Sequence, residues 1–212
     1  EGKTRQGLAK SAQRLTIISQ ERITEELSKI LSSPKPSVGF YLMEQTGVLD
    51  IILPEVAALK GVEQVGEHRH KDVFHHTLKV LDNVALASED IRLRFVALFH
   101  DIAKPVTKQY KPGIGWTFHG HDDLGAKMMK SIGNRLKLPR GTILYCQKLI
   151  KLHLRPIHLA EEGITDSAIR RLLFLAGNET DDLMTFCRAD ITSGNPKRVE
   201  KFLGNFDHVE QR

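Results

Sequence analysis

The sequence predicts an all-α fold in which a larger helical bundle follows a smaller helical unit. Apolar residues recur at spacings of three and four through most of the chain, which is the period of a half-buried helix. No convincing sheet pattern of alternating residues is present. The 212 residues, 41% of them hydrophobic, suffice for one large globular domain or two small ones.

Residues 1–66 are predicted to form the smaller unit, from short and tightly joined helices. The expected helical segments are residues 3–18, a segment between Ser19 and Pro34, a segment from Ser37 to Gly47, and residues 49–59. Serine is a favoured N-cap residue, so Ser19 and Ser37 are expected to begin their helices. Gly47 suits the position just after a helix, because glycine adopts left-handed backbone angles without strain.

Residues 67–212 are predicted to form the bundle. The expected helices are residues 72–87, a helix from Ser88 to His100-Asp101, residues 122–136, 142–153 and 166–176, a helix from Thr180 to Asp190, and a last helix starting at Asn195-Pro196. Ser88, Thr142 and Thr180 are the expected N-caps. Residues 107–118 contain Pro112, Gly113 and Gly115, which indicates a loop or a short hairpin.

Composition excludes some classes of protein. No apolar run approaches the roughly 20 residues that span a membrane, and the start lacks a signal-peptide pattern. Cys146 and Cys187 are isolated thiols in helical segments, which fits a reducing cytoplasm rather than a disulfide framework. A net charge of +5 permits a polyanionic partner without indicating one by itself. The chain begins with Glu1 rather than Met, as expected of a piece of a longer protein.

The chemistry is expected around His100-Asp101, which ends the apolar run 93–99. Burying an unpaired carboxylate costs several kcal/mol, so a cation should lie against Asp101. Adjacent residues lie about 100° apart on a helix, and near its end both side chains can lean toward one ion. Lys104 follows one turn later and can hold a phosphate, while Pro105 is expected to stop the helix.

Nine of the ten histidines fall between His68 and His158, on both sides of this stretch. The predicted metal ligands are His76, His100, Asp101 and Asp190, since imidazole and carboxylate groups suit a catalytic divalent ion. They would come from three helices, as in metal sites within bundle cores. His76 is preferred to His75 because it lies closer to the buried face. The ligand set leaves Mg, Mn, Ni, Fe and Zn open.

His121 and His153 are secondary candidates, each at one end of a predicted helix. They can bind a second ion or a substrate phosphate. We expect one tightly bound ion, with both histidines lining the pocket and a second ion weakly held, if at all. His119 lies beside Gly120 in a loop, which leaves its ligation open. Three further histidines are expected at the surface: His68, His70 and His158.

The order His76, His100-Asp101, Asp190 resembles the H…HD…D pattern of HD-domain metal-dependent phosphohydrolases. The segments 76–78, 98–105, 118–122 and 189–190 resemble the HD region of bacterial CCA-adding tRNA nucleotidyltransferases and related poly(A) polymerases. Residues 22–27 and 47–55 are similar to the neck and RNA-binding segment of that family. The resemblance covers nearly the whole chain. Nothing in it reads as the family's polymerase head, so the chain is expected to be the C-terminal part of such a protein or a headless relative.

The resemblance implies a phosphohydrolase acting at RNA 3′ ends or on cyclic nucleotides. In this interpretation Asp101 orients or deprotonates water, and Lys104 neutralises phosphate charge. The alternative is a non-catalytic tRNA-positioning module with a structural or vestigial metal. Candidate phosphate contacts in the first unit are Arg5, Arg14, Arg22, Lys29 and Lys35. The sequence gives no indication of oligomeric state.

Overall fold

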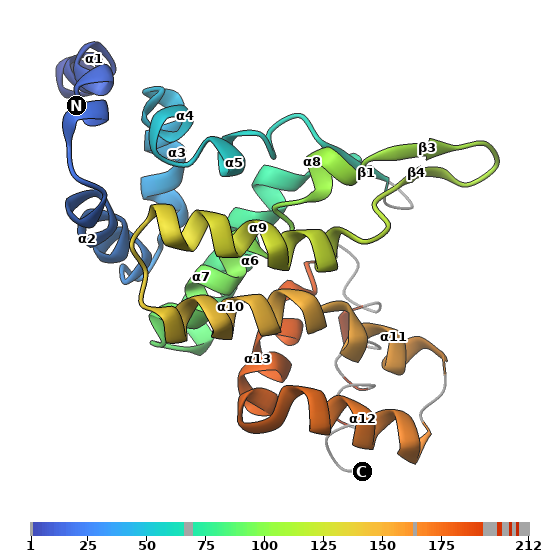
Figure 1. Cartoon of the computed structure of the whole chain (residues 1–212). Helices are drawn as coiled ribbons and strands as arrows, with labels where there is room; N and C mark the ends of the chain where they lie inside the picture. The colour runs from blue at the N-terminus through green and yellow to red at the C-terminus, as the bar shows by residue number, and fades with distance from the viewer. Residues whose placement is uncertain are drawn as a thin grey trace.

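The computed structural model describes residues 2–65, 70–162 and 165–192, together with 199–200, 204 and 207. It confirms the all-α class (Figure 1). The first unit contains α1 (Gly2–Ser11), the 3₁₀ helix η1 (Ala12–Ile17), α2 (Gln20–Leu31), α3 (Ser37–Gln45), α4 (Val48–Ile52) and α5 (Pro54–Ala57). The described part of the chain has no helix long and apolar enough to cross a membrane.

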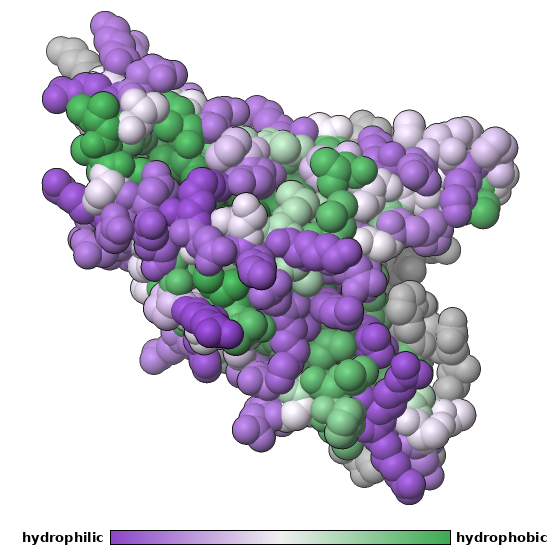
Figure 2. Space-filling view, viewed as in Figure 1, coloured by the Kyte–Doolittle hydropathy of each residue, from purple (hydrophilic) through white to green (hydrophobic). Residues whose placement is uncertain are grey.

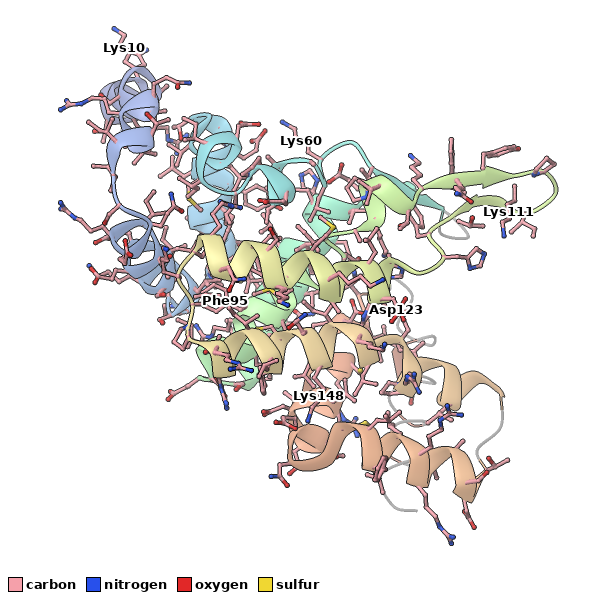
Figure 3. All side chains as sticks on the ribbon, in the orientation of Figure 1. Lys10, Lys60, Phe95, Lys111, Asp123 and Lys148 are labelled. Carbon is pink, nitrogen blue, oxygen red and sulfur yellow. The ribbon has the colours of Figure 1, made fainter. Side chains whose placement is uncertain are left out.

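The bundle surrounds a central pair of helices, α6 (Val73–Ala87) and α7 (Ile91–Phe99). The remaining helical elements are α8 (Lys104–Thr107), α9 (His121–Arg135), α10 (Arg140–Leu152), α11 (Leu154–Glu162), α12 (Asp166–Ala176), η2 (Gly177–Glu179) and α13 (Thr180–Asp190). Phe95 lies within α7, inside the molecule (Figure 3).

Two antiparallel hairpins correct the expectation that the chain holds no sheet. β1 (Glu63–Val65) pairs with β2 (His70–Asp72), a hairpin that the sequence did not predict. β3 (Gln109–Lys111) pairs with β4 (Gly115–Thr117), within the segment 107–118 expected to be a loop or short hairpin.

Several expected helix ends were wrong. The segment 3–18 is divided into α1 and a 3₁₀ helix. Ser37 is the first residue of α3, and Pro36 occupies the N-cap position. The Ser37 hydroxyl donates a hydrogen bond to Asp82 instead of capping its own helix. Thr142 lies inside α10, and Thr180 is the first residue of α13 rather than its N-cap.

The ends around the site also differ. Helix α7 is capped by Asp90, whose carboxylate accepts from the Arg92 amide, while the Ser88 hydroxyl accepts from the Asp90 amide. Pro105 does not stop that helix. It lies in the first turn of α8, a position that needs no amide hydrogen. The start of the predicted last helix, at Asn195-Pro196, lies outside the described residues.

The two units share one hydrophobic core, which runs from Ile23 in α2 to Ala189 in α13. Polar links add to it. Asp82 of α6 accepts from the amide and hydroxyl of Ser37, and Arg135 of α9 donates to the carbonyl of Ile52. The predicted boundary at 66/67 falls in a segment that the structure does not describe, but the described residues on either side pack together.

Helices α9 and α10 run antiparallel and pack closely. A Cβ atom at Gly133 of α9 would lie 2.7 Å from Ile143 Cγ1 of α10, so the close approach requires glycine there. Because α9 begins at His121 and α10 is followed by His153, the pair brings these two histidines to the same end.

Candidate metal centre

The four predicted metal ligands meet where three helices end or begin. His76 lies in the first turn of α6, His100 follows the last residue of α7, and Asp190 is the last residue of α13. His76 Nε2 lies 3.0 Å from Asp190 Oδ1, and 3.4 Å from His100 Nε2. His100 Nε2 lies 3.6 Å from the same Asp190 oxygen. We call His76, His100 and Asp190 the first ligand group; its ligand atoms lie within 4.8 Å of one another.

Asp101 faces two sides with its two carboxylate oxygens. Oδ2 lies 3.1 Å from His100 Nε2 and 3.6 Å from His76 Nε2, beside the first ligand group. Oδ1 lies 3.4 Å from His121 Nε2 on the other side. Lys104 Nζ donates to Oδ2 at 2.7 Å. Asp101 is 1% exposed, so this carboxylate is surrounded by imidazoles and an ammonium group rather than by water.

His121 and His153 form a second ligand group with Asp101, again with ligand atoms within 4.8 Å of one another. The two imidazole rings lie 5.3 Å apart, and the His153 ring lies 5.5 Å from that of His100. Both histidines are buried. The side chains that the sequence assigned to the pocket lining therefore adjoin the four predicted ligands.

Three of the imidazole rings are oriented by the same kind of local hydrogen bond. The Nδ1 atoms of His100, His121 and His153 contact the backbone carbonyls three residues earlier, Ala97, Phe118 and Ile150, at 2.9, 2.7 and 2.6 Å. A carbonyl only accepts hydrogen bonds, so each Nδ1 carries the proton. Each ring therefore turns its Nε2 atom toward the centre, which is the atom left to bind a metal when Nδ1 makes such a hydrogen bond.

Neighbouring positive groups favour the ionised, metal-binding forms of the two carboxylates against the effect of burial. Burial alone would raise the pKa of Asp101, but His100 and Lys104 hold it well below its usual range. Burial also opposes ionisation of Asp190, whose pKa His100 and His76 nevertheless keep low. Burial lowers the pKa of His153 to about 4, so this imidazole is neutral at neutral pH.

Two buried polar atoms support the fit of a cation. His121 Nε2 and Asp190 Oδ1 are buried without a hydrogen-bond partner among the described residues. Orphaned buried polar atoms are costly and usually have a ligand, water or ion to satisfy them. A mixed set of nitrogen and oxygen donors suits a divalent transition metal or Mg²⁺.

The other histidines lie outside the two ligand groups. His75 is exposed and contacts Asp72 through Nδ1, and His119 is exposed in the turn before α9. His68, and the side chains of His70 and His158, lie outside the described part of the chain. Two contacts of the centre were not predicted from the sequence. The Thr192 hydroxyl lies 2.9 Å from His76 Nδ1, and the Cys187 thiol donates to the His153 carbonyl. For Thr192, the only signal in the sequence was its position two residues after the predicted ligand Asp190.

Two family models match the chain. Residues 1–60 match the model described as the probable RNA and SrmB-binding site of polymerase A. Residues 73–194, more than half of the chain, match the HD domain. The second match contains all six residues of the two ligand groups.

Curated relatives are similar to the chain over most of its length. The chain is 31% identical to a CC-adding tRNA nucleotidyltransferase of Thermus thermophilus, over 98% of this chain and 49% of the relative. It is 35% identical to an A-adding tRNA nucleotidyltransferase of Deinococcus radiodurans, over 84% of this chain and 41% of the relative. It is 30% identical to a multifunctional CCA protein of Vibrio parahaemolyticus, over 83% of this chain and 44% of the relative. The chain thus spans about half the length of these relatives.

Proposed function

Because the chain belongs to the HD-domain family and is homologous to the C-terminal portion of bacterial CCA- and A-adding tRNA nucleotidyltransferases, we propose that its metal centre hydrolyses phosphoesters. RNA 3′ ends and cyclic nucleotides are the proposed substrates. The observation that carries the proposal is the position of Asp101, whose two oxygens face the first ligand group and His121. A carboxylate in that position serves both an ion and the reacting groups beside it.

The proposed roles follow from position. The first ligand group and Asp101 Oδ2 would hold a divalent ion, with Mg, Mn, Ni, Fe and Zn all compatible with these donors. Such an ion polarises a phosphoryl group and lowers the pKa of water. Asp101 orients or deprotonates the attacking water. Lys104, 8% exposed, neutralises phosphate charge, and His121 and His153 contact the phosphate oxygens.

We predict that one ion binds tightly. The first ligand group, with Asp101 Oδ2, offers two carboxylates, whereas the second offers only the shared Asp101 and two imidazoles. Elemental analysis after dialysis should therefore find one equivalent of metal. A double variant, His121→Ala with His153→Ala, should retain that equivalent while losing phosphodiester hydrolysis. Two equivalents that survive dialysis, one of them lost in the double variant, would contradict the predicted count.

RNA positioning is the second candidate function, supported by the match of residues 1–60 to an RNA-binding model. Arg14 and Arg22 are exposed on the first unit, with Arg5, Lys29 and Lys35 as further cations. This function does not require a catalytic metal, and both roles can coexist. We propose a cytoplasmic setting for them, which the two buried thiols, Cys146 and Cys187, support.

Salt dependence tests RNA positioning. Two to four phosphate contacts would lower tRNA affinity roughly 10- to 100-fold between 50 and 200 mM salt. Arg14→Ala and Arg22→Ala should each make this dependence shallower. The control variant Lys148→Ala should leave the salt dependence unchanged, because Lys148 pairs with Glu179 in the bundle, far from α2 (Figure 3). Salt-independent affinity, measured by filter binding or anisotropy, would count against the function.

A further inference from the structure

The β3–β4 hairpin projects from the bundle between α8 and the start of α9, the helix that begins at His121 (Figure 1). The chain leaves the centre at Asp101 and Lys104, forms the hairpin, and returns through Phe118 to His121. Both ends of the hairpin are therefore anchored in residues of the centre. Trp116 is five residues from His121, so their Cα atoms lie at most about 18 Å apart.

Two aromatic side chains are held in the open on this hairpin. Tyr110 and Trp116 are directly opposite partners in the strand register, with ring centroids 5.3 Å apart and the rings edge to face. Tyr110 is 63% exposed and Trp116 is 41% exposed. A cross-strand aromatic pair helps to hold an isolated hairpin together. Hairpin stability does not explain why so much of both rings faces solvent.

Cations accompany these rings. Lys108 Nζ lies 4.5 Å from the centroid of Trp116, and Lys104 Nζ lies 5.6 Å from that of Phe118. Lys111 is exposed on β3 (Figure 3), and the hairpin surface is largely hydrophilic (Figure 2). The sequence has no Asp or Glu from residue 102 to residue 121. Lys104 pairs with Asp101, but further out cations and aromatic rings alternate along the hairpin, which has no carboxylate of its own to repel a polyanion.

We propose that the β3–β4 hairpin is a binding platform for single-stranded nucleic acid, which presents the end of the strand to the metal centre. Bases would stack on Trp116 and Tyr110, and phosphates would contact Lys108 and Lys111, the combination by which proteins hold single strands without reading sequence. The platform rests on the proposed function in one respect: it makes an oligonucleotide end, rather than a free mononucleotide, the preferred phosphoester.

Binding can be tested without catalysis. Trp116 is the only tryptophan in the chain, so tryptophan emission, excited at the long-wavelength edge where tyrosine does not absorb, reports on the hairpin alone. With EDTA present, a short single-stranded RNA should quench this emission in a saturable, salt-dependent way. Lys108→Gln and Lys111→Gln should each reduce the logarithmic salt slope by roughly 0.7. Unchanged emission at saturating RNA would overturn the platform, whether or not the centre hydrolyses anything.

Kinetics supply the second test. Trp116→Leu keeps an apolar side chain but removes the stacking surface, so kcat/KM for a single-stranded oligonucleotide should fall about 10-fold or more. Hydrolysis of bis(p-nitrophenyl) phosphate should not change. Phe174→Leu is the matched control, since Phe174 is 87% exposed on α12, and it should alter neither substrate.

The outcomes separate the two proposals. An equal fall for both substrates in Trp116→Leu would indicate damage to the centre and overturn the platform, as would no fall for either. If the unmodified chain hydrolyses neither substrate with any divalent metal, the proposed hydrolytic function fails. The fluorescence titration then still decides whether the hairpin binds single strands.

Discussion

Asp101→Asn should lower metal-dependent phosphodiester hydrolysis at least about 100-fold, since loss of even a hydrogen-bond partner of a metal ligand costs roughly 10- to 100-fold. Asparagine keeps the shape of the side chain but removes the negative charge between the two ligand groups. The Lys104 ammonium also loses the carboxylate to which it donates at 2.7 Å. Initial rates with bis(p-nitrophenyl) phosphate, and bound metal by elemental analysis, measure both consequences.

The matched control for this experiment is Asp123→Asn. Asp123 lies near the start of α9 but is exposed and pairs with Lys151 at 2.9 Å (Figure 3). Activity should be unchanged in this variant. Circular dichroism should show the same helix content for both variants, and His100→Gln serves as a second variant if Asp101→Asn does not fold. Full activity in a folded Asp101→Asn or His100→Gln protein would contradict the hydrolytic centre.

Arg94→Met should destabilise the protein by about 3–5 kcal/mol, the usual cost of disrupting a buried charged network. Arg94 is 5% exposed, and its guanidinium donates to backbone carbonyls. The acceptors are the carbonyls of Leu31, Ser33, Ala85 and Ser88. Urea denaturation followed by circular dichroism measures the loss.

The physical reason is that the Arg94 guanidinium caps the C-terminal ends of two helices, α2 and α6. Helix α2 ends at Leu31 and α6 ends at Ala87, and the last carbonyls of a helix lack intrahelical partners. Each helix C-terminus carries roughly half a negative charge, so two of them balance one guanidinium. Methionine fills part of the space but leaves these carbonyls unsatisfied.

Arg92→Met is the control, two residues away on the same helix. The Arg92 side chain is 47% exposed and pairs with Asp90, so its loss should cost about 1 kcal/mol or less. Similar losses for Arg92→Met and Arg94→Met would show that the buried guanidinium does not stabilise the contact between the units.

The sequence predicted the all-α class and most helical segments, because helix periodicity and the glycine and proline breaks are local signals. His100-Asp101 stood out for a similar reason, since two ionisable residues ending an apolar run conflict with simple burial. The choice of capping residue was not predictable in the same way. Ser88 and Asp90 are both good N-caps, and only the packed chain determines which one begins α7.

The role of Arg94 also could not be predicted from its neighbours in the sequence. It interrupts the apolar run 93–99, yet its acceptors lie up to 63 residues away in the chain. The β1–β2 hairpin was missed because three-residue strands give too little alternation to recognise. Thr192 beside His76 likewise depends on how the end of α13 meets α6.

The carbonyl contacts of His100, His121 and His153 have a consequence for the entropy of ligand capture. Immobilising a flexible side chain on binding costs roughly 0.5–1.5 kcal/mol. These three rings are already fixed by hydrogen bonds within their own turns of chain, so folding has met that cost before any ion arrives. Of the three rings only His100 belongs to the first ligand group, so for the tightly bound ion the saving is about 0.5–1.5 kcal/mol of affinity, compared with the same donor on a freely rotating side chain.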